Sequence, residues 1–364
     1  MRNCIVCKSN NKIELFDSSV TVPSPYPLKG KQKIVQCERC GFIFSDSENT
    51  QEDYQAYYET LNKHKKRAID AQPLDRQYFE KIFNFLGPLD RNVSILDFGS
   101  GDLLMKNMLV EKGFTSVVTY DVDVDLEPGK KFDVIISTHT FEHIVDGDAV
   151  LAKLLSHLKD DGVLLLATPD VEGYLEQYCG PYNWFDLEHI NHFSKTSIQN
   201  FVKNKHLSVI RCVRDKREVR PGLFYPEVIL YCLKNNSGGI YEQYIYDTSY
   251  KALRAYIVKS EGDFHRVLDY IKKNLQKRVI IRGLGIMAMR IIHHFDFGIA
   301  DVDVVDSNVR LVGRTLKGKK ILSPEGCNVG VMDDAVIIVA AVNFKDIVRA
   351  IPEQLSDKVK VIVW

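Results

Sequence analysis

The stretch ILDFGSGDLLMK, residues 95–106, decides the fold of the middle of this chain. A run of apolar residues ends at Asp97, two glycines follow at Gly99 and Gly101, and an apolar, helix-prone stretch comes next. Glycine lets the backbone turn sharply and approach a ligand without a Cβ atom in the way. The pattern therefore predicts a strand, a cofactor-binding glycine loop and a helix. Leu103 stands where many dinucleotide-binding loops have a third glycine, so other residues must decide the kind of cofactor.

An acidic residue follows the next predicted strand, SVVTYDV (116–122). Asp121 lies 20 positions after Gly101, and Asp123 follows two positions later. A carboxylate at this place accepts hydrogen bonds from the hydroxyls of a ribose. We therefore predict that Asp121 binds a ribose, with Asp123 as the alternative.

Strands and helices alternate on both sides of this loop. Apolar runs at 93–98, 132–138 and 162–169 read as strands, and amphipathic stretches from Leu74, at 103–113 and at 148–158 read as helices. Such alternation predicts a parallel, doubly wound α/β sheet. After NNSGG (235–239), a helical stretch at 241–276 leads to a second alternation from Arg278 to the end of the sequence. The sequence thus predicts a second open α/β sheet.

Length and composition limit the classes of protein. The chain has 364 residues, which suggests about two to three domains. The 48 basic and 48 acidic residues balance, so no net charge directs the chain to nucleic acid or to an anionic membrane. No apolar run reaches the length of about 20 residues that a membrane helix needs, and the first residues lack the apolar core of a signal peptide. We expect a cytoplasmic protein that binds neither nucleic acid nor membrane; its oligomeric state stays open.

Two cysteine pairs near the N-terminus have the spacing of a metal site. Cys4 and Cys7 form one C-x-x-C pair, and Cys37 and Cys40 form the second after 29 intervening residues. Four thiolates complete the tetrahedral shell of zinc and leave no position for chemistry. We therefore predict a structural zinc ion that stabilises residues 1–66, a region of short strands and turns with a small core. The other four of the eight cysteines are single, unlike a secreted disulfide framework.

The central motifs together resemble those of the class I S-adenosylmethionine-dependent methyltransferases. They are ILDFGSGD (95–102), TYD (119–121), FDVII (132–136) with FEHI (141–144), and LKDDGVLLLATPD (158–170). S-adenosylmethionine has no pyrophosphate, which agrees with the missing third glycine. The resemblance implies that Asp97, Gly99 and Gly101 line the methionine part, that Asp121 binds the ribose, and that His139 to His143 form a wall of the methyl-transfer cleft. Only ten residues separate TYD from FDVII, so the strand that usually contacts the adenine in this family is missing.

The order of the parts resembles one subgroup, the bacterial C-methyltransferases that act on nucleotide-linked keto sugars. CGFIFSDS (40–47) with YQAYYE (54–59), and DLEHINHFS (186–194), carry this resemblance. It implies methyl transfer to a nucleotide-linked sugar in the biosynthesis of surface polysaccharides or deoxysugars. The chain departs from the subgroup at His139, Asp186 and His192, where Asn, Tyr and Tyr are common. These departures leave the sugar, and carbon or oxygen as methyl acceptor, open.

Methylation of a sugar carbon requires a base. A carbon beside a carbonyl becomes a nucleophile only after it loses a proton, and the enolate oxygen then needs stabilisation. His189, oriented by the carboxylate of Glu188, is the predicted base. His143 is predicted to stabilise the enolate or hold the substrate, and Tyr58 to reach the site from the cysteine region. The same groups could deprotonate a hydroxyl.

A second glycine loop, Gly283-x-Gly285 with Ala288, opens the C-terminal alternation, and Asp306 follows 21 residues after Gly285. Alone, this pattern is typical of a nicotinamide-dinucleotide site, so an NAD(P)-dependent oxidoreductase acting on a nucleotide sugar is the rival function. By the resemblance, Gly283 and Gly285 bind the nucleotide part of the substrate, since a helix N-terminus suits a diphosphate. A non-catalytic nucleotide-sugar-binding protein is a third possibility.

The sequence therefore predicts three parts. They are a zinc-binding region (1–66), a Rossmann-like methyltransferase domain (67–236), and a helical connector with a Rossmann-like substrate-binding domain (237–364). Near the first boundary, four basic residues form either a solvated face or a contact for a substrate phosphate: Lys63, Lys65, Lys66 and Arg67.

Overall fold

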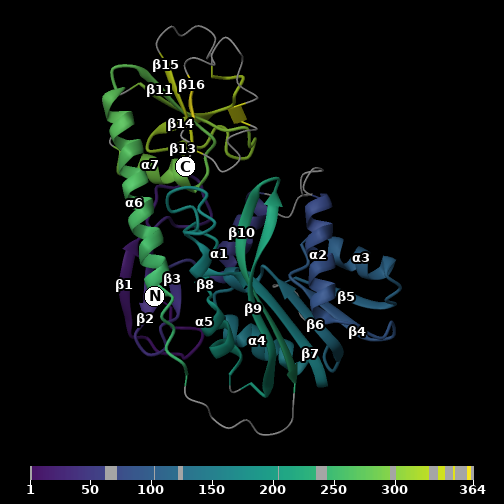
Figure 1. The fold of residues 1–364 in the computed structure, drawn as a ribbon. Helices are drawn as coiled ribbons and strands as arrows, with labels where there is room; N and C mark the ends of the chain where they lie inside the picture. Colours follow the sequence, from purple (N-terminus) through teal and green to yellow (C-terminus); the bar gives the residue numbers. More distant parts are fainter. Residues whose placement is uncertain are drawn as a thin grey trace.

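The computed structural model describes residues 2–61, 72–101, 103–121, 126–203, 205–234, 244–295, 301–327, 335–340, 347–348 and 359–361. Within these ranges the chain forms three sheets, and the predicted α/β class is confirmed (Figure 1). The four basic residues near position 65, and Asp123, lie outside the described residues. The predicted domain boundaries stay predictions.

The N-terminal region forms a four-stranded antiparallel sheet in the order β1-β2-β3-β8. Its own strands are β1 (Lys12–Asp17), β2 (Gln32–Cys37) and β3 (Ile43–Ser47). The fourth, β8 (Asn191–His192), comes from the far side of the central domain and pairs with β3 at Ile43↔His192. A helix not predicted from the sequence, α1 (Gln51–Leu61), follows, with Tyr54 and Tyr57 buried on one face. The region is therefore completed by the segment that carries Glu188 and His189.

The central domain holds a six-stranded sheet in the order β5-β4-β6-β7-β10-β9. Its parallel strands are β4 (Ser94–Phe98), β5 (Ser116–Tyr120), β6 (Phe132–Thr138) and β7 (Leu158–Pro169). Strand β5 is an edge strand, in agreement with the predicted absence of the strand that usually follows it. The other edge is a long antiparallel hairpin that the sequence analysis did not predict, β9 (Leu207–Arg220) and β10 (Leu223–Lys234).

Helices cover both faces of this sheet. One face packs against α2 (Gln72–Leu86) and α3 (Leu104–Glu111). The other packs against α4 (Gly147–Ser156), α5 (Lys195–Val202) and the cysteine-rich N-terminus. Short 3₁₀ turns, η1 (Phe141–His143) and η2 (Val171–Gly173), follow β6 and β7. Because β4, β5 and β6 are parallel and adjacent, their carboxyl ends meet at one edge, where ligands bind in open α/β sheets.

The C-terminal part is a second Rossmann-like sheet, in the order β13-β14-β12-β11-β15-β16. The strands are β11 (Arg278–Arg282), β12 (Val302–Val305), β13 (Thr315–Leu316), β14 (Lys319–Leu322), β15 (Ala335–Val339) and β16 (Val359–Val361), with α7 (Ile286–His294) after β11. The 24-residue helix α6 (Tyr250–Lys273) runs from the N-terminal sheet to this domain (Figure 1). Its buried face joins residues of both into one hydrophobic cluster.

Candidate functional site

The two glycines of the first loop, Gly99 and Gly101, are required for different structural reasons. Gly99 has φ +77°, and a Cβ atom on it would lie 2.2 Å from Thr140 Oγ1, so close packing against the start of η1 requires glycine there. Gly101 has φ +57°, and an added Cβ would meet no atom within 4 Å. The loop is therefore closed against η1 at Gly99 and open to a ligand at Gly101.

Asp121 lies at the same edge as this loop. The N–H of Gly99 donates to the carbonyl of Tyr120 (2.8 Å), which places the residue after β5 beside the glycine loop. Asp97, the second-last residue of β4, is buried. The structure thus brings four of the predicted cofactor residues to one sheet edge: Asp97, Gly99, Gly101 and Asp121. A ribose bound by Asp121 and an amino-acid moiety above Gly101 fit this edge.

His139, the fifth residue assigned to the cofactor, has another environment. Its Nδ1 lies 3.3 Å from Glu142 Oε1 and its Nε2 lies 3.4 Å from Glu227 Oε2. Burial alone would lower the pKa of His139, but the two carboxylates outweigh it and raise the pKa. The ring therefore bridges two buried acids, and it is the neighbouring Thr140, not this ring, that contacts the glycine loop.

Sequence reasoning missed both of these acids. Glu142 is 1% exposed and Glu227 is 0% exposed, and Lys81 of α2 forms an ion pair with Glu227. Burial alone would raise the pKa of each glutamate, but contact with His139 keeps both pKa values below the usual one. A signal existed for Glu227, since it is an acid within the otherwise apolar strand LFYPEVILYCL (223–233). Its partner could not be read from the sequence, because the two residues lie in distant segments.

The predicted catalytic residues do converge. The rings of His143 and His189 are 4.9 Å apart between centroids, and the ring of Tyr58 is 6.0 Å from that of His143. His143 Nδ1 lies 2.9 Å from the carbonyl oxygen of Glu188. Burial, then the charge of Glu188, raises the pKa of Tyr58 well above its usual value. The Tyr58 phenol therefore stays protonated at neutral pH and can donate a hydrogen bond.

A second carboxylate, besides the predicted Glu188, lies beside the predicted base. Asp186 Oδ2 lies 3.6 Å from His189 Nδ1, and Asp186 Oδ1 accepts hydrogen bonds from the N–H groups of Glu188 (3.0 Å) and His189 (2.7 Å). Asp186 thus orients the histidine and fixes the loop around it. The Glu188 side chain instead lies beside Tyr58 and borders a pocket. Burial lowers the pKa of the neighbouring His143, so that imidazole is neutral at pH 7.

The four N-terminal cysteines form one buried cluster. The Sγ atoms of Cys4 and Cys40 are 3.6 Å apart, those of Cys7 and Cys37 are 3.4 Å apart, and all four lie within 4.8 Å of one another. Thiolates about 2.3 Å from one tetrahedral zinc ion lie about 3.8 Å apart, whereas a disulfide requires about 2.05 Å. The arrangement fits a zinc ion held by four thiolates, as the sequence predicts.

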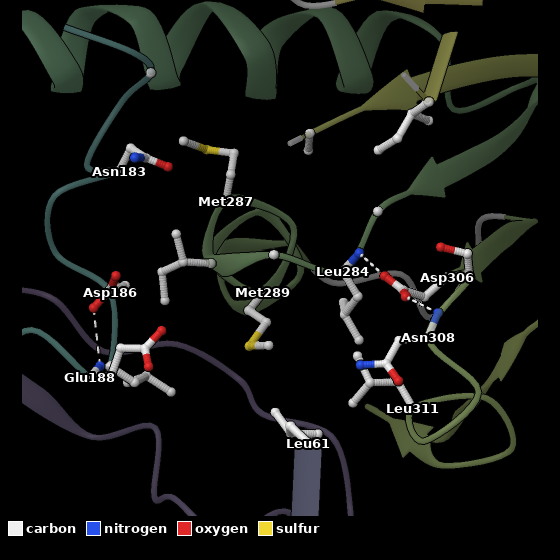
Figure 2. Close-up of a pocket in the computed structure, with 18 of the residues that line it drawn as sticks. Leu61, Asn183, Asp186, Glu188, Leu284, Met287, Met289, Asp306, Asn308 and Leu311 are labelled. Atoms are coloured by element: carbon white, nitrogen blue, oxygen red, sulfur yellow. Dashed lines mark hydrogen bonds between the residues drawn. The ribbon is translucent and has the colours of Figure 1, made fainter. Parts of the chain in front are cut away.

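A pocket of about 440 Å³ lies between the central segment and the C-terminal domain. Asp186 and Glu188 lie on one side of it, and Asp306, Asn308 and Leu311 lie on the opposite side (Figure 2). Its size is in the range of small-molecule sites. Its lining includes the predicted Gly283 and Gly285, with Met287 and Met289 of α7.

The acidic residue of the C-terminal loop, Asp306, forms hydrogen bonds with the backbone of the loop itself. Asp306 Oδ2 accepts a hydrogen bond from the N–H of Leu284 (2.6 Å), between the two glycines, and Asp306 Oδ1 accepts one from Asn308 (2.6 Å) (Figure 2). In a dinucleotide site, this carboxylate would bind the ribose. Here both oxygens hold the loop itself, which weakens the nicotinamide interpretation.

Comparisons agree with the central fold. Residues 70–211 match the family model described as "Methyltransferase domain". Similar structures include an S-adenosylmethionine-dependent methyltransferase from Mesorhizobium loti (13% identity, 44% of this chain and 99% of that one, TM-score 0.35). Another is magnesium protoporphyrin IX methyltransferase from Synechocystis (13% identity, 51% of this chain and 100% of that one, TM-score 0.36). No curated protein matches.

Among the described residues, no helix is long and apolar enough to cross a membrane. The matched region contains the whole edge at which β4, β5 and β6 end, with the glycine loop, Asp121 and the FEHI turn. Residues 70–211 therefore match a methyltransferase domain and form a Rossmann-like sheet.

Proposed function

We propose that this protein transfers a methyl group from S-adenosylmethionine to a nucleotide-linked sugar. The observation that carries the proposal is the position of the pocket, which borders Glu188 on one side and the Gly283–Gly285 loop on the other. One ligand can therefore reach both Glu188, which lies beside Tyr58, and a helix N-terminus suited to a diphosphate. A bacterial pathway to surface polysaccharides or deoxysugars in the cytoplasm is the setting we propose.

The residues at the end of the pocket suit proton removal from a sugar carbon. The pair Glu188 and His189 supplies the base, which takes a proton from the carbon beside the keto group. The protonated Tyr58 can donate a hydrogen bond to the enolate oxygen that forms, and His143, whose Nδ1 hydrogen points to the Glu188 carbonyl, can hold the substrate through Nε2. The carbon then takes the methyl group, and a proton is released to solvent for each turnover. A hydroxyl oxygen could be activated by the same base.

The cofactor would be held by the residues at the sheet edge. Asp121 fits the ribose hydroxyls, and the open space above Gly101 fits the methionine part. When bound, S-adenosylmethionine supplies the methyl group on a sulfonium. The buried cysteines and their predicted zinc ion lie against the opposite face of the sheet from α2 and α3, so their role is to hold the N-terminal sheet, and with it β8, in place.

The charge of the pocket restricts how a diphosphate binds. Its described lining includes the carboxylates of Asp186, Glu188 and Asp306, and no Lys or Arg. A diphosphate therefore has to rely on backbone N–H groups near Gly285 or bring a cation with it. The oxidoreductase alternative meets the same restriction, because its dinucleotide would also place a pyrophosphate here.

Calorimetry tests the cofactor half of the proposal. The purified chain is titrated with S-adenosylmethionine and separately with NADH. We expect micromolar binding of S-adenosylmethionine, loss of that binding in Asp121→Ala, and no change in Asp160→Ala, an exposed acid near the start of β7. Binding of NADH alone would make the C-terminal loop the active centre.

Methyl transfer tests the substrate half. The chain is incubated with S-adenosylmethionine labelled on its methyl carbon and a panel of nucleotide-linked keto sugars and hydroxylated sugars. We expect label in one of them, and a loss of rate without a loss of substrate affinity in His189→Ala. A protein that binds the cofactor and a nucleotide sugar but transfers no label would be the non-catalytic binding protein.

A further inference from the structure

We propose that Glu142, His143 and His189 bind a divalent first-row metal ion, separate from the predicted structural zinc. One carboxylate oxygen and one ring nitrogen from each histidine lie within 4.8 Å of one another. Two imidazoles and one carboxylate form a ligand set of catalytic zinc sites and of iron(II) sites, in which other coordination positions stay open. The ligands come from η1 and from the loop before β8, two segments that only the fold brings together.

The carboxylate of Glu142 is the strongest sign of a cation. Its side chain is 1% exposed, and neither of its oxygens has a hydrogen-bond partner among the described residues. Its Oε1 lies 3.3 Å from His139 Nδ1 and 3.9 Å from His143 Nε2. An ionised carboxylate removed from water requires a cation or several donors. A metal ion between Glu142 and His143 would give this carboxylate a cationic partner in addition to His139.

Both histidines are already oriented as ligands. His143 Nδ1 lies 2.9 Å from the Glu188 carbonyl, so this nitrogen carries the hydrogen and Nε2 presents its lone pair toward Glu142. His189 Nδ1 faces the carboxylate of Asp186 at 3.6 Å. Histidines that bind metals almost always direct their second nitrogen to a carbonyl or a carboxylate. His143 makes this kind of outer contact, and a carboxylate lies near the second nitrogen of His189.

The cluster also has the access that a metal needs. The His143 side chain is 21% exposed and that of His189 is 16% exposed, so one side of the cluster is open. Small rotations of these side chains would bring the ligand atoms to the distance of about 3.4 Å expected around tetrahedral zinc.

This inference rests on the proposed function, and the cation would change which residues act as metal ligands and which acts as the base. Its open positions would take the keto oxygen of the sugar and stabilise the enolate as a Lewis acid. His143 and His189 would then act as ligands, and Glu188, which borders the pocket, would be the proton acceptor.

Cobalt(II) binding tests the site without any substrate, so failure of methyl transfer does not affect the result. The full chain with its zinc in place is titrated with Co²⁺ by absorption spectroscopy and calorimetry. We expect one equivalent bound with the spectrum of nitrogen and oxygen ligands rather than thiolates. Glu142→Gln and His189→Gln should each weaken binding at least 100-fold, and Asp186→Asn should weaken it 10- to 100-fold.

Two controls separate this result from misfolding. His157→Gln changes a histidine whose Nδ1 contacts the Lys130 carbonyl at the other end of the sheet, and it should leave Co²⁺ binding unchanged. Glu142 is buried, so its replacement can also disturb folding. His189 is partly exposed, and the circular dichroism and melting temperature of His189→Gln should match those of the wild type. Absence of Co²⁺ binding in the wild type, or wild-type affinity in either ligand variant, overturns the assignment.

Discussion

Alanine at Gly99 and alanine at Gly101 should have clearly different effects, although the two glycines are two positions apart. Both have positive φ, and a left-handed conformation costs an alanine about 1–2 kcal/mol relative to glycine. At Gly101 that strain is the whole structural effect, because no atom lies within 4 Å of the added Cβ. For a domain of this size we expect the melting temperature to fall by about 2–4 °C per kcal/mol.

At Gly99 a steric clash adds to the backbone strain and lowers the free energy of unfolding further. The new Cβ would lie 2.2 Å from Oγ1, 2.6 Å from Cγ2 and 2.9 Å from Cβ of Thr140. A β-branched side chain has little rotamer freedom, so the start of η1 has to move, at a cost of about 1–3 kcal/mol. Gly99→Ala should therefore destabilise the domain by about 2–5 kcal/mol in total. Since η1 carries Glu142 and His143, methyl transfer should fall as well.

The assay is thermal unfolding of four chains by circular dichroism: wild type, Gly99→Ala, Thr140→Ala and the double variant. Thr140→Ala removes the two closest atoms, so the double variant should be more stable than the sum of the single effects predicts, by at least about 1 kcal/mol. Gly101→Ala is the matched control, because it adds backbone strain without a steric clash. In this variant the free energy of S-adenosylmethionine binding should change more than the free energy of unfolding. Equal destabilisation by the two alanines, or additive effects of Gly99→Ala and Thr140→Ala, would refute the reasoning.

Three further predictions follow from other contacts. Cys37→Ser should abolish the single equivalent of tightly bound zinc measured by mass spectrometry, and it should lower the melting temperature. The raised folded-state pKa of His139 stabilises the fold fully below the unfolded value of about 6.5, and this contribution is lost as pH rises through the folded pKa. The stability difference between wild type and His139→Gln should therefore shrink from pH 6 to pH 9 in thermal melts. The fully buried Arg290 of α7 donates to Ser18 Oγ (3.0 Å) and the Phe185 carbonyl (3.3 Å), so Arg290→Ala should increase amide hydrogen exchange in α7.

Some features of the site could be predicted because their signals are local. The strand, the positive-φ glycines and the acid after the next strand fall within residues 94–121, and each follows from residue type and spacing. The cysteine cluster is similar, since two C-x-x-C turns restrict the geometry before the chain folds. Among the described residues β5 is an edge strand, as the short connection between β5 and β6 predicted.

Other features could not be predicted because they depend on which distant segments meet. The contact between Asp186 and His189 depends on the conformation of the loop before β8, and that loop leads into the pairing of β8 with the N-terminal sheet. The hairpin β9–β10 was missed, and with it Glu227, which reaches His139 from a strand that pairs with β7.

The sequence by itself determined the alternation of strands and helices, the sheet edge where a cofactor binds and the thiolate cluster, because hydrophobic period, turn chemistry and short spacings act within a few residues. Only the tertiary structure decided which acids face His139, which carboxylate orients His189, and that Glu142, His143 and His189 form one cluster. These contacts join segments that are far apart in the chain. They arise from burial, which forces a charged group removed from water to find whatever partner the packing of the sheets brings to it.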